Sequence, residues 1–409
     1  MKQKNNEQIS DSFFLFLIAV LLICVGWSKW KQPFLNLYFE HRIQIAVVLT
    51  SALLGLYVWL RNTLLKKIEA ASFEKEIISG KEEDSVFAGR SKENGREVHI
   101  RQSFRRMHTQ VVGTTNAGKT ESVILPWAVD DIKKGRGLLI IDGKSDRSLL
   151  DKLYGYAARY KRTDDIRILS LCNVSMSHTF NPLADGSPLE VAERVFSAFE
   201  FENEYYRDLQ FEALLQTLLI FQAADIKPTC LRIVQALTRP RHLKRLADLS
   251  AKTPLMDWVR AFMSLSAEDR EKRTSGLVTK LQLFSVDETA LVFNSDKSDI
   301  NLEEALSDGH IIYCQLPVLK IPNLGKATGK LILQCLQSAI SSRHLGAVGE
   351  KPFFSVYLDD FTEYLTPNFV SLLNKSRSAN VAIVFAHQAL GDLAALGDAV
   401  KNTILTNSN

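Results

Sequence analysis

The sequence has little cysteine and only a small excess of positive charge. Five cysteines occur in 409 residues, none in a Cys-x-x-Cys pair, and most lie in apolar runs, as small buried hydrophobes do. This usage indicates a reducing compartment and gives no basis for a structural zinc site. A net charge of +4 is compatible with contact to a polyanion but falls short of a strongly basic nucleic-acid binder.

The chain also lacks the composition of a disordered protein. Apolar residues make up 46% of it and charged residues 23%, which is typical of folded proteins. Because 409 residues exceed what one ordinary hydrophobic core organises, two or three structural units are expected.

Two long apolar runs lie near the start of the chain. Residues 13–27 read FFLFLIAVLLICVGW without a charge, and residues 43–60 form a second run that only Gln44 interrupts. A helix needs roughly 17–25 apolar residues to cross a bilayer core, so the second run is long enough and the first is marginal. We predict a membrane anchor over residues 1–65, with transmembrane helices at about 13–30 and 43–60. The alternatives are a cleaved signal peptide for the first run and a buried globular hairpin.

A charged, helix-compatible stretch then leads to a predicted hairpin. In VFAGRSKENGREVHIRQ, Asn94-Gly95 lies between two alternating segments, and Asn-Gly is the strongest short-range signal for a hairpin turn. The basic residues of this segment can contact nucleic acid or lipid phosphate, or they can form a solvated surface. They are Arg90, Lys92, Arg96, His99, Arg101, Arg105 and Arg106.

A glycine-rich motif follows, GTTNAGKT at residues 113–120, which fits the pattern GxxxxGK[ST]. Residues 108–112 can form a strand that enters it and residues 121–133 the helix that leaves it, the setting in which such a loop binds phosphate. Lys119 then reaches the β and γ oxygens, and the Thr120 hydroxyl holds magnesium. The motif predicts a site for ATP and Mg²⁺. The residues predicted to bind the nucleotide are Gly113, Thr114, Thr115, Asn116, Ala117, Gly118, Lys119 and Thr120.

Residues 137–142 (GLLIID) have the continuous apolar character of a parallel strand buried on both faces. The strand ends in Asp142, and Asp146 follows four residues later. These aspartates can assist water or magnesium at the carboxyl edge of the sheet, or they can cap the helix that begins near Arg147.

Two more apolar strands end in polar residues. Residues 353–358 (FFSVYL) lead to Asp359-Asp360, a Walker B arrangement in which Asp359 reaches the magnesium shell and Asp360 orients the attacking water. The strand NVAIVFA leads to Gln388, which can sense the γ-phosphate. Arg377, eleven residues before Gln388, is either an arginine finger for the next subunit or an exposed surface arginine.

The sequence between these motifs is different in kind. From Leu189 to about Phe293 it is rich in helix formers with apolar residues at i, i+3 and i+4, which predicts an all-helical insertion. A basic run at residues 239–245 and another at residues 270–273 can contact nucleic acid or can be solvated helix faces.

In this order the motifs resemble the type IV coupling proteins of the TraD/TraG kind, the motors of conjugation and type IV secretion systems. The resemblance covers essentially the whole chain, and it includes FNPLAD at residues 180–185. It implies an α/β fold: a RecA-like P-loop NTPase with a mainly parallel sheet, an all-α insertion domain and two N-terminal transmembrane helices. The expected parts are the anchor (1–65), the stalk, hairpin and first part of the nucleotide-binding domain (66–187), the insertion (188–300) and the second part (301–409).

The resemblance also implies a homohexamer in the inner membrane, with two crossings and the ATPase domain in the cytoplasm. Single- or double-stranded DNA would run in a central channel, and a relaxase and the type IV secretion channel proteins would be partners. Carried onto this chain, Asp359 is the Walker B acid, Arg377 a finger acting in trans and Gln388 the sensor. The eleven-residue spacing of the last two matches the family.

Two departures from the family are apparent. Relatives usually have Asp-Glu where this chain has Asp359-Asp360, so slow turnover, or an acid supplied by Asp146, is an open alternative. The chain also ends at Asn409, where relatives continue into at least one more strand, which suggests a truncated product.

Three functions compete at this level. The first is an ATPase that couples hydrolysis to transfer of DNA or protein into a secretion channel. The second is a DNA translocase resembling FtsK, against which the large helical insertion and the two-crossing anchor argue. The third is a docking receptor that binds nucleotide and recruits cargo without translocating it.

Overall fold

The computed structural model describes residues 39–40, 50–63, 84–114, 116–201, 203–250, 253–346, 351–366, 368–394 and 397–408. The chain divides into two compact units, residues 1–77 and 78–409. In the first unit, residues 50–63 are helical. The first predicted membrane span and the start of the second lie outside the described residues, and no described helix is both long and apolar enough to cross a bilayer. The anchor therefore stays a prediction.

The second unit is built on a six-stranded sheet in the order β3-β8-β7-β4-β6-β5, with every pair parallel. The predicted strand at residues 137–142 is a central strand with all six residues buried, which explains its continuous apolar run. The α/β class with a parallel sheet is confirmed. The strands are β3 (Thr109–Val112), β4 (Gly137–Asp142), β5 (Ile166–Ser170), β6 (Ile311–Gln315), β7 (Phe354–Asp359) and β8 (Val381–His387).

Helices cover both faces of this sheet. Because side chains alternate along a strand, Leu139 and Ile141 of β4 belong to one hydrophobic core while Leu138 and Ile140 belong to another. The second core includes residues of the two helices that follow the glycine-rich loop and β4. The helices around the sheet are α3 (Leu125–Lys133), α4 (Arg147–Arg159), α13 (Leu302–Asp308), α14 (Pro322–Leu345), α15 (Phe369–Ser376), α16 (Leu390–Ala394) and α17 (Asp398–Thr406), with short turns η3 (Thr163–Asp165), η4 (Val174–Met176), η5 (Phe361–Tyr364) and η6 (Arg377–Ala379).

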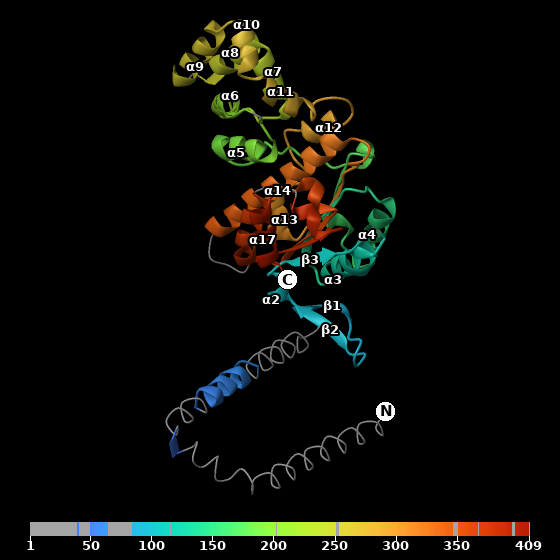
Figure 1. The fold of residues 1–409 in the computed structure, drawn as a ribbon. Helices are drawn as coiled ribbons and strands as arrows, with labels where there is room; N and C mark the ends of the chain where they lie inside the picture. The colour runs from blue at the N-terminus through green and yellow to red at the C-terminus, as the bar shows by residue number, and fades with distance from the viewer. Residues whose placement is uncertain are drawn as a thin grey trace. The chain divides into compact units, whose positions relative to one another are not determined.

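A run of helices separates β5 from β6 in the chain, within the stretch predicted to be a helical insertion. The first helix begins with a capping box between Ser187 and Glu190, and it packs on α14 and on the next helix (Figure 1). The helices of this run are α5 (Pro188–Ala198), α6 (Glu204–Ala223), α7 (Cys230–Thr238), α8 (Pro240–Ser250), α9 (Thr253–Ser264), α10 (Ala267–Lys272), α11 (Ser275–Gln282) and α12 (Ala290–Phe293).

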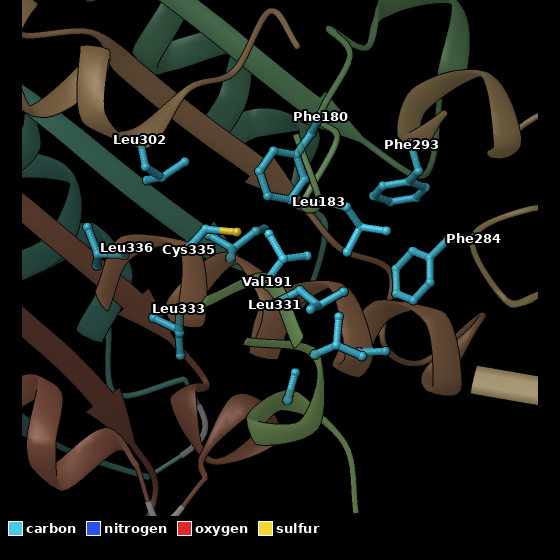
Figure 2. Packing of buried hydrophobic residues seen from close by; sticks show 14 of the residues in the cluster. Phe180, Leu183, Val191, Phe284, Phe293, Leu302, Leu331, Leu333, Cys335 and Leu336 are labelled. Atoms are coloured by element: carbon cyan, nitrogen blue, oxygen red, sulfur yellow. The ribbon is translucent and has the colours of Figure 1, made fainter. Parts of the chain in front are cut away.

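The base of the insertion shares its core with the sheet domain. Figure 2 shows Phe180 and Leu183, from the FNPLAD segment, beside Val191 of α5 and beside Leu331 and Cys335 of α14. All five side chains are at most 9% exposed. Burial of apolar surface contributes about 25 cal/mol per Å², so this shared core fixes the base of the insertion to the sheet domain.

A two-stranded antiparallel hairpin, β1 (Ser85–Arg90) and β2 (Glu97–Arg101), precedes the sheet and is followed by α2 (Gln102–Arg105). The hairpin predicted around Asn94-Gly95 is thus present, but residues 91–96 form a longer loop than the two-residue turn that this dipeptide favours. Gly95 is the left-handed residue of that loop, with φ of +70°.

Candidate nucleotide-binding site

The glycine-rich loop begins where β3 ends. The Gly113 N–H donates to the His387 carbonyl of β8 at 3.2 Å. Asn116 and Gly118 adopt left-handed backbone, with φ of 63° and 77°. Such a conformation strains most side chains, so the loop requires glycine at position 118. Thr115 lies outside the described residues.

The Lys119 side chain turns back into this loop. Its Nζ donates to the Gly113 carbonyl at 2.6 Å and to the Thr114 carbonyl at 3.2 Å, and the residue is 9% exposed. The Ala117 N–H also donates to the Thr114 carbonyl, at 3.1 Å. The carbonyls of Gly113 and Thr114 therefore hold the lysine ammonium inside the loop.

The turn after Lys119 is a π-helix, η2 (Thr120–Ile124), rather than the first turn of the α-helix expected over residues 121–133. Pro126 has no N–H and cannot make the α-helical bond to the Ser122 carbonyl, which accounts for the wider turn that precedes it. Helix α3 continues regularly from there to Lys133.

Thr120 joins the loop to the acidic pair. Its hydroxyl donates to Asp359 Oδ2 at 2.7 Å, although the two residues are 239 positions apart. Asp359 is the last residue of β7 and is 1% exposed, and Asp360 follows with a left-handed φ of 50°. The structure therefore brings the glycine-rich loop and the paired aspartates together at the carboxyl edge of the sheet.

Lys144 is a site residue that the sequence reasoning did not single out. Its Nζ lies 3.1 Å from Asp360 Oδ2 and 3.6 Å from Asp359 Oδ2. Burial alone would lower the pKa of Lys144, but the two carboxylates outweigh burial and raise the pKa above its ordinary value. The available signal was its position two residues after β4, because neighbouring parallel strands end at one edge.

Asp142 holds the turn that carries this lysine. Its carboxylate accepts the backbone N–H groups of residues 144–146 at 2.7 to 3.1 Å and the Tyr313 hydroxyl at 2.6 Å. Burial raises the pKa of Asp142 in spite of these hydrogen bonds. The Asp146 carboxylate accepts the Ser148 N–H at 2.8 Å and so caps α4. The catalytic role of Asp146 stays a prediction.

Tyr364 packs against this turn and against α14. A Cβ atom added to Gly143 would lie 2.3 Å from the Tyr364 hydroxyl oxygen, and one added to Gly329 would lie 2.2 Å from its ring. Only glycine fits at both positions, and burial raises the pKa of the tyrosine. Tyr364 thereby links the segment after the paired aspartates to the turn before Lys144.

Gln388 and Arg377 lie at opposite ends of β8. Gln388 follows His387, which pairs with Val112 and accepts the Gly113 N–H, so it lies beside the start of the glycine-rich loop. Arg377 is exposed and precedes the strand. Seven strand residues span about 23 Å. Within one chain the structure brings Gln388 to the loop and leaves Arg377 at the other edge of the sheet.

Arg105 corrects the expectation of a basic surface along the hairpin. It is fully buried, and its guanidinium makes two hydrogen bonds of 2.8 Å to the Asp131 carboxylate. Since a buried, paired arginine cannot reach nucleic acid or lipid phosphate, Arg105 contributes to the packing of the core.

The basic run of the insertion faces a cavity of about 590 Å³. Arg241 and Arg245 are four residues apart on α8, a spacing at which like charges repel. Within the ranges that the structure describes, no carboxylate lies within ion-pair distance of the arginines that line it. The charged lining residues are Arg239, Arg241, His242, Arg245 and Arg270.

The residues at the loop fit Mg²⁺. The Thr120 hydroxyl and the Asp359 carboxylate are hard oxygen donors in contact with each other, and Mg²⁺ in nucleotide sites takes one or two protein oxygens together with waters and phosphates. Among the described residues, no group of three or more His, Cys, Asp or Glu side chains could hold a metal ion.

A glycine-rich loop between a parallel strand and a helix, facing an acid at the end of a nearby strand, defines a P-loop NTPase of the RecA-like class. A family model for "Type IV secretory system Conjugative DNA transfer" matches residues 59–189. The type 4 coupling protein DotL of Legionella pneumophila is 22% identical over 366 residues, which cover 75% of this chain and 46% of DotL. The chain thus spans about half the length of that relative.

Solved structures share the fold. The plasmid coupling protein TrwB in complex with ADP and Mg²⁺ matches with a TM-score of 0.57 at 14% identity, over 82% of this chain and 75% of TrwB. VirB4 of Thermoanaerobacter pseudethanolicus matches with a TM-score of 0.53 at 15% identity, over 81% and 83% of the two chains. The motifs, the family model over residues 59–189 and the curated relative all indicate similarity to the type IV coupling proteins.

Proposed function

We propose that this protein is a membrane-anchored ATPase that couples ATP hydrolysis to the transfer of DNA, with its relaxase, or of a protein substrate into a type IV secretion channel. The observation that carries the proposal is the 2.7 Å hydrogen bond between Thr120 and Asp359, since one metal–nucleotide pair can use both groups. The apolar runs before residue 61 support the anchor, and an ATP-using domain must then face the cytoplasm.

In this proposal the glycine-rich loop holds the triphosphate. Lys119 exchanges its carbonyl partners for phosphate oxygens, and the N–H groups at the start of η2 add positive potential. Bound Mg²⁺, held by Thr120 and Asp359, would neutralise charge on the phosphates. Asp360 orients the attacking water, or Asp146 does so in its place.

In this proposal Gln388 senses the bound nucleotide, and Arg377 completes the site of another subunit. Gln388 lies beside Gly113 and relays the state of the γ-phosphate to β8. Arg377 lies too far from its own loop, so it would act on the loop of a neighbouring subunit in a homohexamer. Mixing Lys119→Ala with Arg377→Ala protein should then restore part of the ATPase activity that each variant lacks, because some interfaces combine an intact loop with an intact arginine. Mixtures as inactive as the parents would contradict a finger in trans.

The arginine-lined cavity of the insertion supports contact with a polyanion. We propose that Arg241 and Arg245 bind phosphates of single-stranded DNA. The double variant Arg241→Ala/Arg245→Ala should weaken binding of a labelled oligonucleotide and reduce the slope of log affinity against log salt by about 1.4. Lys244→Ala is the matched control, since Lys244 is on the same helix and does not line the cavity. Equal slopes in wild type and double variant would exclude this surface.

The ATPase itself is tested on the purified full chain. We expect ATP hydrolysis that DNA stimulates, and a loss of at least about a hundredfold in Lys119→Ala. Phosphate release in detergent or in vesicles, with and without oligonucleotide, measures both. A Lys119→Ala variant that hydrolyses ATP as fast as wild type would contradict the proposal.

One observation favours the docking receptor as a second candidate. Asp360 has a short carboxylate, is in left-handed backbone and is paired with Lys144, so it reaches a water less readily than a longer acid would. Nucleotide binding without turnover, even with DNA and the secretion channel proteins present, would select the receptor over the motor.

A further inference from the structure

Two groups converge on one oxygen of the acidic pair. Asp359 Oδ2 accepts the Thr120 hydroxyl at 2.7 Å and lies 3.6 Å from the Lys144 ammonium. The same ammonium lies 3.1 Å from Asp360 Oδ2. Lys144 therefore spans the two aspartates and is closer to the second.

A magnesium ion held by Thr120 and Asp359 would use the same carboxylate. Mg²⁺ binds its oxygen ligands at about 2.0–2.1 Å, so the metal would lie within a few ångströms of the lysine. Two cations on one carboxylate repel each other strongly. The lysine can yield, because its side chain is 48% exposed while that of Asp359 is 2% exposed.

The backbone around Lys144 favours a shift of the side chain alone. Asp142 fixes the turn through three backbone N–H groups, and Tyr364 closes against Gly143. The turn is therefore held while the flexible lysine stem changes its partner.

We propose that Lys144 competes with Mg²⁺ for Asp359, and that metal binding moves the ammonium from Asp359 onto Asp360. The metal then contacts Asp359 and the lysine contacts Asp360, so that Lys144 positions the carboxylate that faces the attacking water. This inference rests on the proposed function, since it takes the loop to bind Mg²⁺ with a nucleotide.

The test measures metal affinity rather than turnover. Mn²⁺, used as a paramagnetic probe, is titrated into the full chain with and without saturating ADP, and free Mn²⁺ is read by electron paramagnetic resonance. Lys144→Met keeps the length of the side chain and removes its charge, and we expect Mn²⁺ to bind about tenfold more tightly. Lys144→Arg keeps the charge and should bind Mn²⁺ as wild type does.

Lys152→Met is the matched control. Lys152 is also a lysine near the loop, and its Nζ pairs with Glu121 at 2.6 Å, one residue after Thr120. Its partner is not a metal oxygen of the site, so removal of this charge should change Mn²⁺ affinity by less than about twofold. A similar gain in Lys144→Met and Lys152→Met would show a general effect of charge and overturn the specific competition.

Two further outcomes overturn the inference. One is an unchanged or weaker affinity for Mn²⁺ in Lys144→Met, and the other is weaker ADP binding without any gain in metal affinity, which would make Lys144 a phosphate ligand. The fate of the proposed function is read separately. If the wild-type protein binds Mn²⁺ and ADP but hydrolyses no ATP, the proposed competition for Asp359 stands and the proposed ATPase function is wrong.

Discussion

The buried ion pair between Arg105 and Asp131 offers a sharp test of how the chain before the glycine-rich loop is attached to the sheet. The two side chains are fully buried and joined by two hydrogen bonds of 2.8 Å. Arg105 also donates to Ser355 and Tyr357 of β7, at 3.0 and 2.9 Å. The ring of Trp127 lies 5.5 Å from its guanidinium carbon.

Arg105→Met would leave the Asp131 carboxylate buried without its main counter-charge. Burial alone would raise the pKa of Asp131, but Arg105 and the hydroxyl donors outweigh it and lower the pKa from 3.8 to about 2. A shift of that size corresponds to roughly 2 kcal/mol of folding free energy. Removing one partner of a buried pair costs about 3 to 5 kcal/mol, so we expect a loss of about 3 kcal/mol.

Urea unfolding followed by tryptophan fluorescence measures this loss, because Trp127 lies against the pair. The double variant Arg105→Met/Asp131→Leu removes both charges and should recover part of the stability, since apolar residues of similar size replace buried ion pairs at little cost. Recovery is incomplete because Tyr357 and Arg136 lose Asp131 as a partner. A single variant that loses less than about 1 kcal/mol, or a double variant no more stable than the single one, would refute the argument.

Two other predictions concern stability. Because the pKa of Asp131 is lowered, the ionised carboxylate contributes fully to folding stability above its ordinary pKa near 3.8, and this contribution is lost as the pH falls to about 2. Over that pH range the urea midpoint should therefore fall less steeply in Arg105→Met than in wild type. Gly329→Ala should destabilise the protein by about 1–3 kcal/mol, because the added Cβ would lie 2.2 Å from the Tyr364 ring. Gly155→Ala is the control and should be neutral or stabilising, because its Cβ would contact nothing. Equal urea midpoints for the two variants would contradict the clash.

The motifs that carry chemistry could be predicted because each one combines a local pattern with a defined element. The pattern GTTNAGKT after an apolar strand predicts a phosphate loop, and two aspartates after a second apolar strand predict its acidic partner. Parallel strands that end at one edge bring such residues together. The contact of Thr120 with Asp359 is therefore the expected meeting of two motifs.

Other parts of the fold had no such signal. Strands β5 and β6 have only five residues each, and short apolar runs of this kind do not separate strand from helix by periodicity. Helix α14 is buried along much of its length, so its polar face is narrow and reveals the helical period poorly. The hairpin arginines look alike in sequence, and only tertiary packing shows that Arg105 is in the core.

Topology also changes what a spacing can mean. Eleven residues separate Arg377 from Gln388, and a resemblance based on that spacing assigns both to nucleotide chemistry. In the fold those eleven residues are a turn and one whole strand, so the two side chains lie at opposite edges of a sheet about 23 Å across at β8. A strand cannot bend back within its length, and the spacing therefore forbids both residues from serving the same loop in one chain. If both take part in hydrolysis, the functional unit must contain at least two copies, with the carboxyl edge of one sheet facing the amino edge of the next.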